Sequence, residues 1–149
     1  MLTLSDIVIR LACSFACGVF IGLERQLNHR LAGIHTCVLV SIGSCLFVFV
    51  SAAIDNDNSP SRVAAQVVTG IGFLGSGIII KDNNQIKGLN TAATIWCCGA
   101  IGCLCGCGLW LTGMCCGVFI SILNYTLRDT LIKRVLGKFI TEEHKENVI

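Results

Sequence analysis

A stretch of 40 residues without Asp, Glu, Lys or Arg, residues 88–127, constrains this sequence most strongly. As one α-helix it would be about 60 Å long at 1.5 Å per residue, roughly twice the thickness of the hydrocarbon core of a bilayer. A single crossing cannot use such a length. Gly106-Cys107-Gly108 lies near the middle and favours a tight turn, because glycine has more backbone freedom than other residues. We predict two membrane-spanning helices joined there.

Three more apolar segments come earlier, at residues 5–23, 34–54 and 63–80. Each is close to the 20 or so residues that a spanning helix needs. The composition agrees, because only 13% of the residues are charged, compared with roughly 25% in soluble proteins. The sequence therefore predicts an all-α integral membrane protein, a bundle of about five transmembrane helices. The net charge of +2 is too small to indicate a nucleic-acid partner.

The basic residues predict how the chain is oriented. Five spans place residues 24–33, residues 81–87 and the segment after residue 127 on one side, and these hold nine of the eleven Lys and Arg residues. The positive-inside rule puts that side in the cytoplasm, with the N-terminus outside and the C-terminus inside. We predict a transmembrane domain at residues 1–127 and a short cytoplasmic tail at residues 128–149. The spacing of apolar residues predicts an amphipathic surface helix over residues 127–140.

Glycines recur at spacings that suit close helix packing. Gly18 and Gly22, Gly102 and Gly106, and Gly113 and Gly117 form G-x-x-x-G pairs, which let two helices approach closely. Residues 70–77 match G-x-G-x-x-G, but they lie in an apolar span without a preceding strand, so the dinucleotide-binding interpretation fails. We interpret this run as a groove where another helix packs or where the helix loosens. Its glycines are Gly70, Gly72, Gly75 and Gly77.

A few polar residues lie in or beside the spans, where such side chains are costly and often functional. The candidates are Glu24, Arg25, Arg62, Gln66, Asn90, Thr91 and Thr94. Glu24 could anchor the first span at the interface, or turn into the bundle and pair with a base from another helix. Asn90 could cap a helix. With Thr91 and Thr94, it could instead offer oxygens to a cation or to another helix.

Two other spacings suggest local pairs. Arg62, Gln66 and Thr69 can share one helix face, and Asp6 and Arg10 are four residues apart and could form an ion pair.

Eleven cysteines are present, seven of them between Cys97 and Cys116. We interpret them as small apolar residues of packed helices. The alternative is soft-metal or redox chemistry at Cys103, Cys105 and Cys107. The sequence completes no recognisable ligand set and no catalytic constellation, so we expect no metal site, no cofactor and no enzyme activity.

Four blocks of the sequence resemble the MgtC/SapB/YhiD membrane protein family. They are Gly22-Leu23-Glu24-Arg25-Gln26, Ala32-Gly33 followed by Thr36, residues 62–75, and residues 88–96. The resemblance implies a multi-pass protein of the bacterial inner membrane, linked to growth at low magnesium and to intracellular survival as a virulence factor. It also implies a regulator of membrane potential, or of another membrane protein such as the proton ATP synthase. The family motif residues that match are Glu24, Arg25, Arg62, Gln66, Asn90, Thr91 and the glycine run.

The sequence departs from the family pattern at several points. His35 stands where the family usually has Arg, and Ser76 stands where Ala is common. An acidic residue often lies shortly before the motif Arg, but Ser59-Pro60-Ser61 precede Arg62 and the nearest acid is Asp57. MgtC proteins also have a soluble C-terminal domain, which we expect this chain to lack.

Two functions remain in contention. The first is a small membrane regulator, whose partners are the lipid bilayer, another inner-membrane protein and, as a further candidate, a second copy of the chain. The alternative is a transporter or channel for Mg²⁺ or a monovalent ion, which would use Arg62, Gln66, Asn90 and Thr91 near the glycine-rich helices. No carboxylate lies deep in a span, whereas Mg²⁺ favours carboxylate and water oxygens. We therefore favour the regulator.

Overall fold

The computed structural model describes residues 3–54, 60–82 and 85–127, and within them it has five helices and a short hairpin. The elements are α1 (Leu4–Leu27), α2 (Ile34–Ile54), α3 (Pro60–Ile78), β1 (Ile80–Asp82), β2 (Gln85–Lys87), α4 (Leu89–Gly106) and α5 (Trp110–Thr126). The predicted all-α bundle of five helices is confirmed, and so is the turn between α4 and α5. Gly108 lies in that turn with a φ of +89°, which favours glycine.

The helices differ in how well they suit a membrane. Within the described residues, α1, residues Ile34–Ala53 of α2, and α4 are long and apolar enough to cross one. The apolar helix α5 is shorter, with 17 residues, and α3 carries Arg62, Gln66 and Thr69 among its 19 residues. Spanning is therefore supported for three of the five expected segments.

The hairpin was not predicted, since residues 81–87 were expected to form a basic loop. Strands β1 and β2 pair antiparallel, with Lys81 opposite Ile86, and Lys87 forms an ion pair with Asp82 at 2.7 Å. Gly88 then starts α4 with a φ of +94°. A Cβ at this position would lie 2.2 Å from the carbonyl oxygen of Ile78. Only glycine lets the chain turn from the hairpin into α4 so close to the end of α3.

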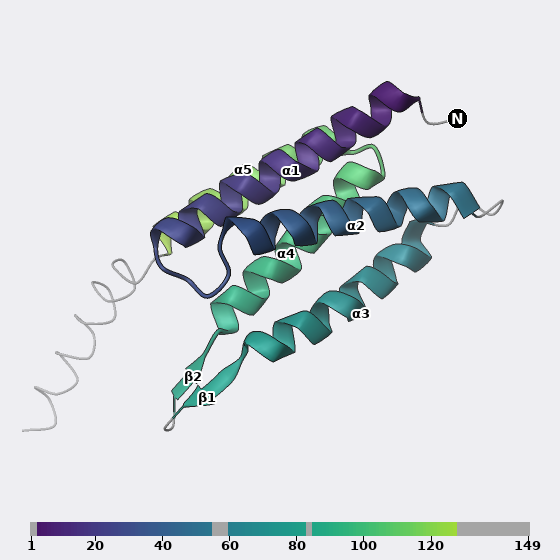
Figure 1. Ribbon diagram of the computed structural model, residues 1–149. Helices are drawn as coiled ribbons and strands as arrows, with labels where there is room; N and C mark the ends of the chain where they lie inside the picture. The colour runs from purple at the N-terminus through teal and green to yellow at the C-terminus, as the bar shows by residue number, and fades with distance from the viewer. Residues whose placement is uncertain (1–2, 55–59, 83–84, 128–149) are drawn as a thin grey trace, which may run out of the picture.

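Helix α4 is the centre of the bundle. It contacts all four other helices, while α1 packs against α2 and α5, and α3 lies at the edge against α4 and α2 (Figure 1). Buried residues of α1, α2 and α4 form the main core, and five of its seven members are cysteines: Cys17, Cys37, Cys45, Cys98 and Cys105. Two pairs of thiols are neighbours between helices, Cys17 with Cys105 and Cys37 with Cys98. Cysteine here is a small residue that fills tight contacts.

Glycines on α1 and α4 allow the closest backbone contacts. A Cβ at Gly18 would lie 2.6 Å from Val38 Cα, and one at Gly22 would lie 2.4 Å from Ile34 Cα. On α4, a Cβ at Gly102 would lie 2.1 Å from the Ser41 carbonyl oxygen, and one at Gly106 would lie 2.7 Å from Val48 Cβ. Helices α1 and α4 therefore both pack closely against α2 through their glycines.

The glycines of α3 are arranged differently from the sequence prediction. A Cβ at Gly70, Gly72 or Gly77 would meet nothing within 4 Å, and one at Gly75 would touch Ala92 at 3.5 Å. Among these four, only Gly75 would therefore touch another helix of the same chain. Gly72 leaves open space on the outer side of α3, and Gly70 leaves it on the side toward α2.

The polar N-terminal end also differs from the expected Asp6–Arg10 ion pair. Asp6 and Thr3 form a capping box at the start of α1, which satisfies exposed N–H groups. Arg10 reaches across to α4 and donates from Nη1 to the Gly106 carbonyl oxygen at 2.8 Å. A cation at a helix C-terminus interacts favourably with the unpaired carbonyls there.

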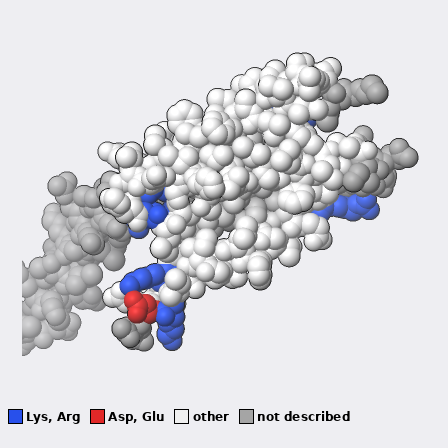
Figure 2. Space-filling view, viewed as in Figure 1, with Lys and Arg blue, Asp and Glu red and all other residues white. Residues whose placement is uncertain are grey.

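The basic side chains are distributed unequally between the two ends of the bundle. In Figure 2, Lys and Arg gather mainly at the end that holds the hairpin and the α1–α2 loop, where Lys81, Lys87 and Arg30 lie. Arg62 is exposed at the opposite end. The cytoplasmic placement of the first end remains a prediction, and the amphipathic helix and tail predicted beyond residue 127 lie outside the described residues.

We expect Gly102→Ala to destabilise the bundle by about 1–3 kcal/mol, because its Cβ would overlap a backbone oxygen of α2. Gly72→Ala is the matched control, since its Cβ would enter open space and alanine favours helix. The measurement is unfolding of the detergent-solubilised variants, followed by tryptophan fluorescence. Equal stability of the two variants would show that α2 and α4 do not pack this closely.

Candidate functional site

Arg25 is the most deeply buried charged residue that the structure describes, with 1% of its surface exposed. It lies in the last turn of α1. Its Nε donates to the Ala32 carbonyl oxygen at 3.0 Å, Nη1 donates to Thr94 Oγ1 at 2.9 Å, and Nη2 donates to Thr91 Oγ1 at 2.6 Å. One guanidinium therefore ties together α1, the α1–α2 loop and the first turns of α4. We call these four residues the Arg25 cluster.

Local backbone geometry brings these partners together. Gly22 lets α1 lie against Ile34 at the start of α2, which places the connecting loop beside Arg25. The Gln26 side chain then accepts a hydrogen bond from the Ile34 backbone N–H at 3.2 Å, and this satisfies one of the open donors at the start of α2. Thr94 Oγ1 donates to the Asn90 carbonyl oxygen at 2.8 Å and so presents its lone pairs to Arg25.

The described acceptors of Arg25 are all neutral. An arginine stays protonated in proteins, and burying its charge costs several kcal/mol unless hydrogen bonds replace water. Three different nitrogens of the guanidinium donate to the three acceptors, a pattern that the single ammonium of lysine cannot match. The Cys37 and Cys98 thiol pair lies beside the same guanidinium. The cluster therefore holds a positive charge in a fixed position in the interior of the protein.

The other polar candidates lie elsewhere. Glu24 is partly exposed and accepts a hydrogen bond from the Asn28 side chain on its own helix, so the structure differs from the alternative in which Glu24 turns into the bundle. Asn90 is exposed, and the N-cap of α4 is Gly88 rather than Asn90. Arg62, Gln66 and Thr69 are all exposed on α3. Of the seven candidates, only Arg25, Thr91 and Thr94 come together.

One buried polar contact was missed by the sequence analysis. Ser41 Oγ of α2 donates to the Ser14 carbonyl oxygen of α1 at 3.0 Å, and the two hydroxyl oxygens lie 2.9 Å apart. Both residues are fully buried. Two serines inside apolar spans were the available signal, since hydroxyl groups can bond between helices in a membrane.

The cysteines considered for metal chemistry do not converge. Cys105 is buried, Cys103 is half-buried, and Cys107 is exposed at the turn after α4. In residues 3–54, 60–82 and 85–127, no group of three or more His, Cys, Asp or Glu side chains could hold a metal ion.

The apolar helices, the glycine contacts between them and the buried Arg25 cluster are together typical of a helical membrane protein. The model of the MgtC family matches residues 11–131 of this sequence. The chain therefore belongs to the MgtC family.

Several relatives are similar over most of the chain. Protein MgtC of Brucella abortus (strain 2308) is 52% identical over 118 residues, which are 79% of this chain and 50% of that protein. Protein MgtC of Salmonella typhimurium (strain LT2) is 42% identical over 82% of this chain and 52% of the relative. An uncharacterized protein of Synechocystis, slr0014, is 45% identical over 83% of this chain and 53% of the relative. The chain spans about half the length of these curated relatives, and no solved structure matches it.

We expect Arg25→Lys to destabilise the protein by about 1–3 kcal/mol, because a lysine leaves buried acceptors of the Arg25 cluster without donors. Glu24→Gln is the neighbouring control. Its side-chain oxygen can still accept from Asn28, so its effect should stay within about 0.5 kcal/mol.

Both variants are compared by unfolding in detergent. A greater loss of stability in Glu24→Gln than in Arg25→Lys would contradict the assignment of Arg25 as the centre of the buried contacts. It would favour the alternative in which Glu24 turns into the bundle and pairs with a base.

Proposed function

We propose that this chain is a small regulatory protein of the bacterial inner membrane that acts by binding another membrane protein. As the family resemblance implies, the partner is one that controls membrane potential, such as the proton ATP synthase, and the role belongs to growth at low magnesium and survival inside host cells. The N-terminus faces outward and the C-terminus faces the cytoplasm. Membership of the MgtC family supports this proposal.

The outer face of α3 is the surface to which we expect another membrane protein to bind. Ala65, Thr69, Gly72 and Ser76 recur every three or four residues and are all exposed. The two hydroxyls donate to carbonyl oxygens of their own helix, Thr69 to Ala65 at 3.1 Å and Ser76 to Phe73 at 2.7 Å. We call these four residues the α3 outer face. Small residues and self-satisfied hydroxyls let another transmembrane helix approach closely.

The Arg25 cluster favours regulation over ion transport. Thr91 and Thr94 were the candidate oxygen ligands of a cation, but both accept hydrogen bonds from Arg25. A buried guanidinium repels a cation at close range, since the interaction of two charges grows as the local dielectric constant falls. Two of the three oxygen ligands proposed from the sequence are therefore already hydrogen-bonded to Arg25.

We expect Gly72→Leu to weaken partner binding about tenfold, or about 1.4 kcal/mol, because its side chain would fill the contact where two helices meet. Ala100→Leu on the exposed side of α4 is the control, since it adds three carbons away from the α3 outer face. The measurement is ATP-driven proton pumping by purified ATP synthase in vesicles, with and without the chain. Pumping that is unaffected by the wild-type chain would reject this partner.

Vesicles that contain only this chain should show no saturable flux of Mg²⁺, K⁺, Na⁺ or protons, because two of the three candidate ligands, Thr91 and Thr94, are hydrogen-bonded to Arg25. Empty vesicles and Asn90→Ala serve as controls. A saturable flux that Asn90→Ala abolishes would replace the regulator with the transporter.

A further inference from the structure

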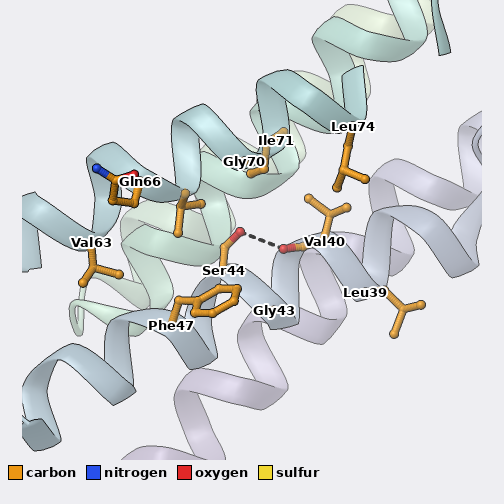
Figure 3. Close-up of a pocket in the computed structure, with 11 residues that line it drawn as sticks. Leu39, Val40, Gly43, Ser44, Phe47, Val63, Gln66, Gly70, Ile71 and Leu74 are labelled. Carbon is orange, nitrogen blue, oxygen red and sulfur yellow. Dashed lines mark hydrogen bonds between the residues drawn. The ribbon is translucent and has the colours of Figure 1, made fainter. Parts of the chain in front are cut away.

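An apolar groove of about 470 Å³ runs between α2 and α3. Figure 3 shows its walls: Phe47, Gly43, Val40 and Leu39 come from α2, and Val63, Gln66, Gly70, Ile71 and Leu74 come from α3. Ser44 also lines the groove, but its hydroxyl donates to the Val40 carbonyl oxygen at 2.8 Å. Apart from Gln66 near one end, the groove therefore offers almost no polar group to an occupant.

Two facing glycines create this space. A Cβ at Gly43 on α2 or at Gly70 on α3 would meet nothing within 4 Å. Large apolar side chains at the edges remain exposed, Phe47 by 60% and Leu74 by 52%. The groove is thus open along its side, toward the surroundings of the bundle, and its depth comes from missing side chains rather than from loose packing of the core.

The dimensions of the groove fit one acyl chain. Val63 and Leu74 mark its extent along α3, about 17 Å at 1.5 Å per residue. One leaflet of the hydrocarbon core is about 15 Å deep. A helix with its side chains is 10–12 Å wide, too wide to lie between α2 and α3, which are themselves in contact.

The charge at one end of the groove indicates which lipid it suits. Arg62 precedes Val63, the first groove residue of α3, and its side chain is exposed in the first turn of that helix. Gln66 stands one turn further along. A phospholipid whose chain filled the groove would place its headgroup near this guanidinium, and a basic side chain at the surface favours anionic headgroups.

We propose that the groove between α2 and α3 is a binding site for one acyl chain of an anionic phospholipid, whose phosphate lies at Arg62. Hydrocarbon alone gives little preference for the groove over the bilayer, because lipid tails are as apolar as its walls. Selectivity comes from packing on several sides and from the headgroup. The site lies beside the α3 outer face but does not include Gly72, so lipid binding and partner binding can be separated.

Native mass spectrometry of the full chain in mild detergent tests the proposal, after delipidation and addition of phosphatidylglycerol or phosphatidylcholine. We expect one retained phosphatidylglycerol per chain, with about a fivefold preference over phosphatidylcholine. Gly43→Leu should lower this retention about tenfold, since its Cβ meets no atom within 4 Å and the rest of the side chain extends into the groove. Gly72→Leu adds the same side chain in open space outside the groove and should retain lipid like the wild type.

Two further variants complete the test. Arg62→Gln should keep a phospholipid but lose the preference for phosphatidylglycerol. Gly70→Leu fills the groove from the opposite wall, so it replaces Gly43→Leu if that variant fails to fold. Wild-type retention in the groove-filling variants would overturn the proposal. A dimer that Gly43→Leu dissociates without changing lipid retention would overturn it too, in favour of a second copy of the chain.

Discussion

The buried guanidinium of Arg25 is the interaction on which the arrangement of this bundle most depends. Its three described hydrogen bonds reach the α1–α2 loop and two turns of α4, segments up to 69 residues away in the sequence. No choice of apolar residues fixes the rotation and the height of two helices in this way, because packing in a membrane is only weakly directional. Hydrogen bonds to a planar cation are directional, and leaving any of them unmade has a cost. The cluster therefore sets the register of α1 against α4.

Small residues then bring the backbones together around that register. Gly102 and Gly106 of α4 and Gly18 and Gly22 of α1 all allow close contact with α2. Buried cysteines fill the remaining space, and their abundance is explained by volume, since a thiol is little larger than a methyl group and tolerates apolar surroundings. Ser14 and Ser41 add a direct hydrogen bond between α1 and α2 in the same layer. Packing and polar contacts thus act on the same helix pairs.

The sequence predicted the helices better than it predicted the site. Residues 34–54 coincide with α2, and the turn at Gly106-Cys107-Gly108 separates α4 from α5. The first span was expected to end at residue 23, because Glu24-Arg25-Gln26 reads as a polar interface. Helix α1 continues to Leu27, so Arg25 belongs to the bundle and not to a basic loop. The partners that make this burial tolerable lie on α4, and local hydropathy contains no information about them.

The same reasoning explains why α3 stands apart from the other helices. Its inner face, with Val67, Ile71 and Gly75, is buried against the bundle, whereas glycines and small polar residues are exposed on its other sides, beside Val68, Phe73 and Leu74. At the exposed glycine positions, a helix that only had to cross a bilayer would also carry large apolar side chains, since lipid offers them contacts on all sides. Glycine at Gly43 and Gly70 removes such contacts on the side of α2, and glycine at Gly72 removes them on the outer side. The missing side chains on these two sides of α3 are explained if a different molecule occupies each side. A lipid chain would lie in the groove, and a protein helix would lie on the outer face.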